Sequence, residues 1–308
     1  MTDIAETRNV SVIGIGQMGG GIAKNLDNAE LLSGVYDASS DQMSSLNFSD
    51  AVIRGPLDKV AEVSEFVIFV VPSSKQIVEC LEGRKGLLAN ARPSTVYLDF
   101  TTSDPQETLE VAQLVQEKGM HYLDCGMSGG GRGADTGQLT LMIGGEKDQI
   151  ERCSQLISVI ANVDNVFHVG QQGAGHTMKL IHNMVCHSNF FVLCEAGRLA
   201  EESGIPLQTA INVINAGNAR SLISEQRFPN HILSGTWDAR STVSNLAKDL
   251  NMGVEHSKKL GRPAVFAGET LRLLKDAMGS DLSDEDFSTL YRCYDDLMQN
   301  RWKKLEES

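Results

Sequence analysis

Short apolar runs alternate with amphipathic stretches over the first half of the chain. The runs are rich in β-branched and aromatic residues and are bounded by Gly, Pro, Ser or Asp, which is typical of buried strands. They cover residues 10–15, 32–36, 66–71 and 95–98, with further strands expected at 121–123, 139–143 and 166–169. Residues 18–26 and 105–118 predict helices between them. This alternation predicts a parallel sheet with helices on both faces.

The pattern changes after Gly170. One helical pattern without proline runs over residues 173–203 and ends at Ser203-Gly204. Further helices are expected at residues 206–215, 241–260, 264–278 and 284–298, the last with a capped start at Ser283-Asp284. The chain therefore predicts an α/β domain with a doubly wound sheet over residues 1–169 and an all-helical domain over residues 170–308.

Composition narrows the range of partners and compartments. The 308 residues are enough for two domains with separate cores. A formal net charge of -13 repels phosphate backbones, so no nucleic-acid partner is expected. The strongest apolar run is too short to span a membrane, and the polar N-terminus is unlike a secretory signal. The six cysteines form no C-x-x-C pair, which indicates reduced thiols and a cytoplasmic protein.

A glycine-rich turn joins the first predicted strand to the first predicted helix. Gly14 permits the tight turn, and Gly16 lets the backbone approach a pyrophosphate at the positive end of the helix. A G-x-G pattern alone is weak evidence, but its position at the first strand-to-helix junction favours a dinucleotide site over an ordinary turn. Together with the alternating strands and helices, the turn predicts a Rossmann-type domain.

Asp37 follows the second predicted strand, about twenty residues after the glycine turn. An acid at this position accepts hydrogen bonds from the adenosine ribose and repels the 2′-phosphate of NADP. No arginine follows it in Ala38-Ser39-Ser40. NAD is therefore the expected cofactor and NADP the less favoured one, while the alternative interpretation is a solvated turn aspartate.

Four separated motifs occur along the chain. They are Gly14-x-Gly16-x-Met18-Gly19 with Asn25-Leu26, Asp99-Phe-Thr-Thr102, the glycine-rich segment 124–139, and Gly173-x-Gly175-x-x-x-Lys179-x-x-x-Asn183. In combination they resemble the β-hydroxyacid dehydrogenase family, which includes 3-hydroxyisobutyrate dehydrogenase and tartronate semialdehyde reductase. The resemblance covers nearly the whole chain and implies a helical C-terminal domain like that of 6-phosphogluconate dehydrogenase.

The resemblance also implies a role for each motif. Cofactor contacts are expected from Gly14, Gly16, Gln17, Met18, Gly19, Asp37, Val71, Pro72, Thr102 and Lys248. The substrate carboxylate is expected at Ser128, Gly129 and Gly130, whose hydroxyl and unobstructed N–H groups suit an anion. Catalysis is expected from Lys179 and Asn183.

Lys179 and Asn183 are four residues apart on a predicted helix and therefore share one face. An ammonium group can protonate the oxygen of a carbonyl that is being reduced, whereas the reverse reaction needs a neutral amine. Because a lysine pKa of about 10.4 is too high for that, burial and nearby cations such as Lys248 are expected to lower the pKa. The alternative interpretation is a solvated helix lysine, which the surrounding motif disfavours.

The chain departs from the usual pattern of the family in the substrate segment. Where Asp-Ala-Pro-Val-Ser is usual, this chain has Asp124-Cys-Gly-Met-Ser128, and the glycine is expected to loosen the segment. His182, Cys186 and His187 lie close together in sequence, but nothing completes a ligand set, so packing is favoured over a metal site.

These observations favour an NAD-dependent oxidoreductase that interconverts a small 3-hydroxy acid and its semialdehyde. The alternatives are an NADP-linked aldehyde-acid or imine reductase and a non-catalytic dinucleotide-binding scaffold. The lysine at position 179 argues against both an imine reductase and a scaffold. Relatives pair through their helical domains, so a homodimer or homotetramer is expected, with a small carboxylate as the substrate and no membrane partner.

Overall fold

The computed structural model describes residues 8–299. The chain forms two compact units, the first ending at Lys179 and the second beginning at Leu180. This division falls inside the helix α10 (Ala174–Glu202), which begins shortly after the boundary predicted at residue 170. Each unit has its own hydrophobic core, and the two are described separately below.

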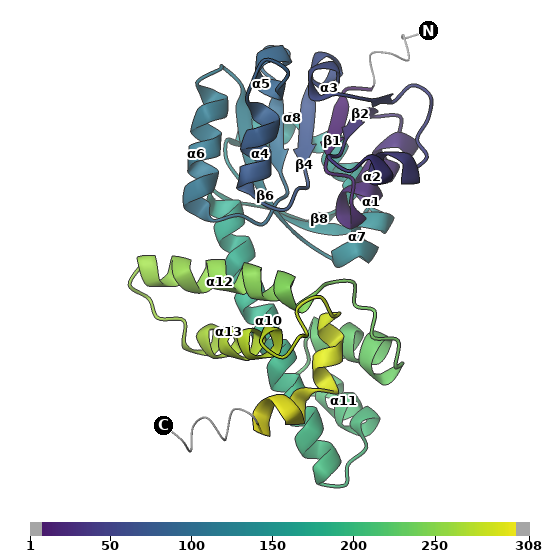
Figure 1. The fold of residues 1–308 in the computed structure, drawn as a ribbon, viewed down its shortest axis with the longest axis vertical. Coiled ribbons are helices and arrows are strands. Elements are labelled where there is room, and N and C mark those ends of the chain that lie inside the picture. Colours follow the sequence, from purple (N-terminus) through teal and green to yellow (C-terminus); the bar gives the residue numbers. More distant parts are fainter. Residues whose placement is uncertain (1–7, 300–308) are drawn as a thin grey trace. The chain divides into compact units, whose positions relative to one another are not determined.

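The first unit is built on one eight-stranded sheet with the order β3-β2-β1-β4-β5-β6-β7-β8 (Figure 1). The strands are β1 (Val10–Ile13), β2 (Leu32–Tyr36), β3 (Ile53–Arg54), β4 (Phe66–Phe69), β5 (Val96–Asp99), β6 (His121–Ser128), β7 (Leu139–Gly144) and β8 (Ala161–Gly170). The pairs are parallel except β6 with β7, which is antiparallel. The prediction of a doubly wound sheet is confirmed, although β3 was not predicted and the sheet is not wholly parallel.

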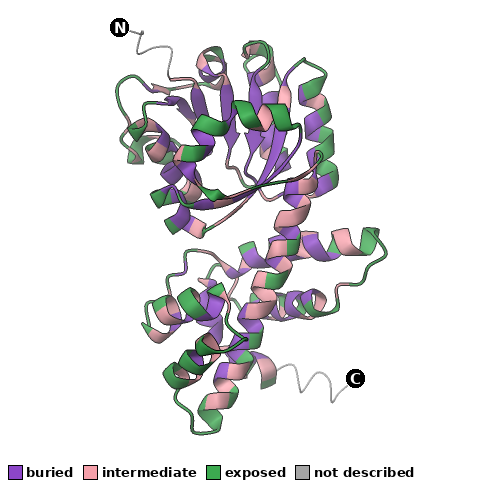
Figure 2. Cartoon of the chain, turned by 180° about the vertical axis from the view of Figure 1, so that it is seen from behind, coloured by how far each residue is buried: buried purple, intermediate pink, exposed green. Residues whose placement is uncertain are grey.

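Helices cover both faces of this sheet. They are α1 (Gln17–Asn28), α2 (Ser40–Ser45), α3 (Leu57–Val63), α4 (Ser74–Leu81), α5 (Leu87–Asn90), α6 (Pro105–Gln116), α7 (Gly130–Thr136), α8 (Lys147–Arg152) and α9 (Ser154–Ile160). Neighbouring strand residues alternate between two cores: Ile68 packs in one cluster with α1 and α9, and Phe69 packs in the other with α3, α4 and α6. Figure 2 shows the strands as buried between these layers.

The order of the strands reverses direction between β1 and β4. From β1 the chain moves outward to β2 and β3, and then returns to β4 on the other side of β1. Ligands of doubly wound sheets bind at this switch point, beyond the carboxyl ends of the strands. The glycine turn after β1, Asp37 after β2 and Val71 after β4 all lie at that edge.

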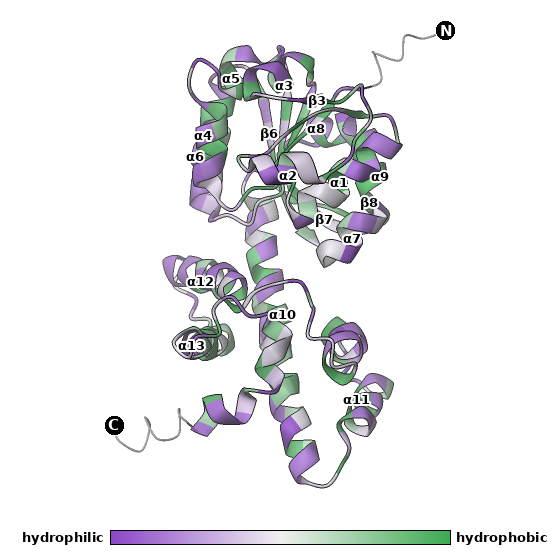
Figure 3. Cartoon of the chain, turned by 45° about the vertical axis from the view of Figure 1, so that its right-hand side comes forward, coloured by the Kyte–Doolittle hydropathy of each residue, from purple (hydrophilic) through white to green (hydrophobic). Residues whose placement is uncertain are grey.

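The second unit is helical around one core. After α10 come α11 (Leu207–Ala216), a π-helix (Ile223–Leu233), α12 (Val243–Lys259), α13 (Val265–Met278) and a 3-10 helix (Phe287–Tyr291). Figure 3 shows hydrophobic and hydrophilic residues interspersed along α10. No helix within residues 8–299 is long and apolar enough to cross a membrane.

The prediction of a helix over residues 284–298 is wrong in its first half, where the structure has a turn and a short 3-10 helix. Residues before Phe287 instead run beside the start of α12: the N–H of Val243 donates to the carbonyl of Glu285 at 3.0 Å, and that of Phe287 to the carbonyl of Ser241 at 2.9 Å. The carboxylate of Asp286 caps the short 3-10 helix that follows. These backbone bonds to a distant segment outweigh the local helical pattern.

Candidate functional site

The glycine turn after β1 leaves the N-terminus of α1 open. Gly14 has a φ of +86°, and a Cβ there would collide with the carbonyl oxygen of Val70, so only glycine fits. Gly16 is the N-cap of α1, and no side chain caps this helix. Nothing lies within 4 Å of the position that a Gly16 Cβ would occupy. The turn therefore offers an uncapped helix N-terminus with room for an anion, which fits the pyrophosphate of a dinucleotide.

The other predicted residues of this turn lie around the same helix start. Gln17 is exposed and Met18 packs against the core with its side chain half-buried. A Cβ on Gly19 would collide with the carbonyl oxygen of Gly14, so the helix and the turn are in direct backbone contact. This close packing is the usual role of the third glycine in a dinucleotide fingerprint.

Asp37 lies directly after β2 and bonds to the glycine turn. One carboxylate oxygen accepts the N–H of Ile15 at 2.9 Å, and the other accepts the N–H of Ser39 at 2.8 Å. The side chain is only half-buried. Asp37 is thus held beside the turn by two backbone donors, at the place where an acid contacts the adenosine ribose.

The loops after β4 and β5 lie together. The N–H of Val71 donates to the hydroxyl of Thr101 at 3.4 Å, and the N–H of Thr101 donates to the carboxylate of Asp99 at 2.8 Å. Pro72 and Thr102 follow these residues in the two loops. The predicted cofactor residues of the first unit therefore gather at one edge of the sheet.

The predicted substrate segment begins at the end of β6. Ser128 is the last residue of the strand, and Gly129 and Gly130 follow with φ values of +125° and +61°, which other residues adopt only with strain. The helix α7 that starts there packs on α1, where the side-chain amide of Asn25 donates to the carbonyl of Ala134 at 2.7 Å. This contact links the substrate segment to the helix of the glycine turn.

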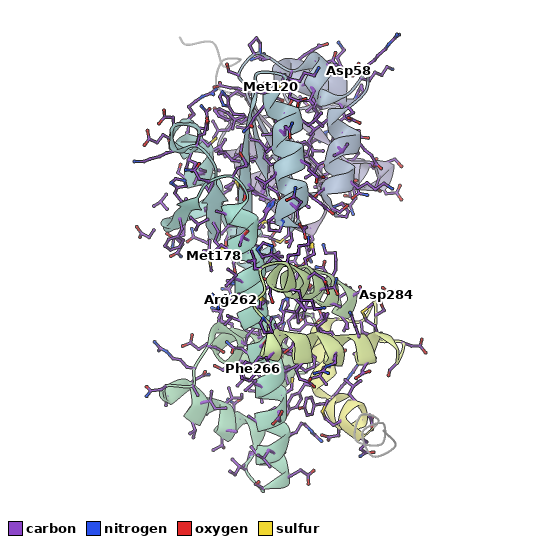
Figure 4. All side chains as sticks on the ribbon, turned by 90° about the vertical axis from the view of Figure 1, so that its left-hand side faces the viewer. Asp58, Met120, Met178, Arg262, Phe266 and Asp284 are labelled. Atoms are coloured by element: carbon purple, nitrogen blue, oxygen red, sulfur yellow. The ribbon has the colours of Figure 1, made fainter. Side chains whose placement is uncertain are left out.

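The start of α10 lies directly on β6. Asp124 in β6 accepts the N–H of Gly173 at 2.8 Å and the N–H of His176 at 2.9 Å. One turn further, the Cβ of Lys179 lies 2.6 Å from the position of a Cβ on Gly126. Met178, which precedes Lys179, is labelled on this helix in Figure 4. The expectation that Gly126 loosens the segment is wrong, because Gly126 lies inside strand β6 and faces this helix.

A buried polar group connects the same helix start to the middle of the sheet. The imidazole of His176 is fully buried, with Nε2 3.0 Å from the carbonyl of Asp99 and Nδ1 2.7 Å from the hydroxyl of Thr108. The hydroxyl of Tyr122 donates to the Asp99 carboxylate at 2.5 Å. Burial raises the pKa of Asp99, and the neighbouring His176 and the Tyr122 hydroxyl offset part of this rise.

Two predicted residues belong to the second unit and share one carboxylate there. The side-chain amide of Asn183 donates to Oδ2 of Asp249 at 3.0 Å. Nζ of Lys248 lies 3.4 Å from Oδ1 of the same group. Asn183 and Asp249 are buried, whereas Lys248 is exposed. Asp249 thus orients the amide of Asn183, one turn after Lys179 on α10.

Both halves of the chain match known families. Residues 9–170 match the family described as the NAD binding domain of 6-phosphogluconate dehydrogenase, a match that alone spans more than half of the chain. Residues 173–294 match the NAD-binding domain of NADP-dependent 3-hydroxyisobutyrate dehydrogenase. The chain belongs to the β-hydroxyacid dehydrogenase family.

Individual relatives in this family cover the chain almost end to end. A 2-(hydroxymethyl)glutarate dehydrogenase from Eubacterium barkeri is 28% identical over 293 residues, covering 94% of this chain and 95% of its own length. A Dictyostelium discoideum protein named "Probable 3-hydroxyisobutyrate dehydrogenase, mitochondrial" is 28% identical, covering 93% and 91%. The crystal structure of a Salmonella typhimurium 3-hydroxyisobutyrate dehydrogenase has a TM-score of 0.82 at 25% identity, covering 92% and 99%.

Sequence reasoning missed the residues that hold the family's motifs in place. Asp124 begins the glycine-rich segment and His176 lies between Gly175 and Lys179 of the last motif, but neither had a role of its own. Asp249 follows Lys248 and was not singled out. Their partners lie far away in sequence, so only the folded chain reveals them. Among the described residues, no group of three or more His, Cys, Asp or Glu side chains could hold a metal ion.

Proposed function

We propose that this protein is an NAD-dependent oxidoreductase that interconverts a small 3-hydroxy acid and its semialdehyde, with Lys179 as the proton-transfer residue. One observation carries the proposal. Lys179 lies against Gly126 of β6, two residues before Ser128, in the same unit as the glycine turn. A lysine, a segment suited to a carboxylate and a dinucleotide turn are the groups that this reaction needs.

The residues present fit a bound dinucleotide. The uncapped start of α1 suits the pyrophosphate, and Asp37 suits the ribose of the adenosine. When bound, the nicotinamide accepts or supplies a hydride. The carboxylate of Asp37 supports a preference for NAD, because the 2′-phosphate of NADP would bring a second negative charge beside it.

Proton transfer is assigned to Lys179, and binding of the substrate carboxylate to the segment at the end of β6. In oxidation the amine of Lys179 takes the proton of the substrate hydroxyl, and in reduction the ammonium returns it to the same oxygen. Asn183, oriented by Asp249, can hold the amine or the substrate oxygen by a hydrogen bond. The hydroxyl of Ser128 and the backbone around Gly129 and Gly130 bind the carboxylate of the substrate.

A steady-state screen tests this assignment. Wild-type protein is assayed in both directions with 3-hydroxy acids of three to five carbons and their semialdehydes, using NAD(H) and NADP(H), while NADH binding is followed by fluorescence. Saturable turnover of at least one acid with NAD is expected. Tight NADH binding without turnover of any acid would favour a scaffold, and turnover of cyclic imines alone would favour an imine reductase.

Self-association is a separate part of the proposal. The described part of α10 exposes the apolar residues Ile181, Val185, Val192 and Leu199. The homodimer or homotetramer expected for this family stays a prediction, and light scattering on the purified protein measures it. A monomer at all concentrations would contradict it.

A further inference from the structure

Three glycines let the first turns of α10 lie directly on the backbone of the sheet. A Cβ on Gly175 would collide with the carbonyl oxygen of Asp124 in β6. A Cβ on Gly144 in β7 would lie 2.8 Å from the backbone nitrogen of Gly175, and one on Gly126 in β6 would lie 2.8 Å from the carbonyl oxygen of Gly175. We call Gly126, Gly144 and Gly175 the glycine seat of α10.

Hydrogen bonds hold the start of α10 against the glycine seat. The carboxylate of Asp124 accepts two backbone N–H groups of the helix start, those of Gly173 and His176. The buried side chain of His176 reaches to the carbonyl of Asp99 on β5 and to the hydroxyl of Thr108 on α6. The helix start is therefore attached to β5, β6 and α6, so it has little freedom to shift.

Gly126 differs from the other two glycines in what it contacts. The Cβ of Lys179 lies 2.6 Å from the position that a Cβ on Gly126 would occupy. The space beside Gly126 is therefore filled by the lysine and is not open to a substrate. The Cα of Lys179 lies 3.5 Å from the same point. Since both atoms lie at the root of the lysine side chain, a rotamer change cannot relieve the clash of a Cβ at position 126 at the spacing that β6 and α10 have in this chain.

We propose that Gly126 is a positioning residue for Lys179: its lack of a side chain sets how closely the lysine approaches β6 and the segment at Ser128. This inference rests on the proposed role of Lys179. A methyl group at position 126 would need a separation of about 3.5–4.0 Å from the Cβ of Lys179, so the helix must move outward by about 1 Å. A displacement of about that size costs up to about 100-fold in rate when it separates reacting groups.

The test compares Gly126→Ala with Gly55→Ala, whose added methyl would meet only the side chain of Ile53 at 3.7 Å. Each variant is characterised by its kcat and KM, the pH profile of kcat, the Kd for NADH and the thermal midpoint. Competitive acetylation across pH, read by mass spectrometry on the peptide that carries Lys179, follows the amine without turnover. The exposed Lys59 serves as the internal reference for the labelling.

In Gly126→Ala we expect kcat to fall 10- to 100-fold, with the Kd for NADH within about twofold of wild type. The pH profile of kcat and the labelling profile of Lys179 should both shift, while Gly55→Ala matches wild type. Wild-type kcat and unchanged Lys179 labelling in the folded variant would overturn the inference. So would an equal loss of NADH binding, because the effect would then be a general distortion.

A second variant covers the case in which Gly126→Ala does not fold. Asp124→Asn keeps the shape of the side chain but replaces one accepting oxygen by a donating amide, so the bonds to Gly173 and His176 cannot both remain. It should also shift the labelling of Lys179, and unchanged labelling would overturn the inference. If wild type turns over no hydroxy acid but the labelling still shifts, the proposed function fails and the positioning role stands.

Discussion

Replacement of Asp37 by serine should change the choice of cofactor. In wild type the carboxylate is held by the N–H groups of Ile15 and Ser39, at 2.9 and 2.8 Å. The serine variant removes the negative charge and frees both donors. These N–H groups can then donate to phosphate oxygens, so NADP should bind better and NAD should lose the expected ribose contact.

The magnitude follows from the charges. A phosphate monoester carries a charge of about −1.5 to −2 at neutral pH. At a separation of about 4 Å, each pair of unit charges costs about 1 kcal/mol in water and about 4 kcal/mol near a protein surface. Because Asp37 is half-exposed, the lower part of this range applies, and the total is about 2–3 kcal/mol. This corresponds to a preference for NAD of roughly 30- to 150-fold.

The assay is the ratio of kcat/KM for NAD to kcat/KM for NADP. We expect the ratio to fall by roughly 30-fold or more in Asp37→Ser, chiefly through a lower KM for NADP. Asp50→Ser is the matched control, because it removes an exposed charge from the turn before β3 and should leave the ratio unchanged. A wild type that prefers NADP, or a ratio that stays within threefold in Asp37→Ser, would refute this reasoning.

Three further predictions concern stability, the amide of Asn183 and thiol chemistry. Burial alone would raise the pKa of Asp27, but its interactions with Arg8 and its hydrogen bonds from Ser49 together outweigh burial, so the pKa is lowered. Asp27→Asn should therefore cost about 1–3 kcal/mol of unfolding free energy at pH 7, and denaturant titrations should show this cost disappearing as the pH falls through the lowered pKa, below about 3.8. Asp249→Leu should lower kcat by about tenfold with little change in the Kd for NADH, since it releases the amide of Asn183, and an unchanged kcat would count against the orienting role. Burial raises the pKa of Cys80 to about 11, so at pH 8 iodoacetamide should modify it about 100-fold more slowly in the folded than in the unfolded protein, as mass spectrometry can measure; equal rates would contradict the buried placement.

Local patterns predicted the strands other than β3 and the longer α-helices, whereas the helices α2 to α5 and α7 to α9 and the π-helix were not predicted. The strand at Leu32–Tyr36 and the helix over Ala174–Glu202 follow from unbroken patterns with clear ends. The edge strand Ala161–Gly170 was predicted only in its second half, because Asn162 and Asp164 give its first half the composition of a loop. Its pairing with β7 decides the conformation there.

The candidate site also has a part that the sequence predicted and a part that only the folded chain reveals. Motifs with fixed spacing, such as that of Gly14 and Gly16, predicted where the turn lies and what it fits. The attachment of α10, which carries Lys179, to the sheet depends on residues far apart in sequence, since the His176 side chain contacts the carbonyl of Asp99, 77 positions away. No local pattern carries that information. Likewise, Gly126 was expected to add freedom, whereas its missing side chain allows a tight contact that only the folded chain reveals.

The central claim is that the amine of Lys179 moves the proton of the reaction. Its most direct test is the single-turnover rate constant for hydride transfer in Lys179→Ala, compared with Lys118→Ala, which alters an exposed lysine after α6. We predict a fall of about 100-fold or more in Lys179→Ala alone, with the Kd for NADH unchanged. A rate constant within threefold of wild type would contradict the account.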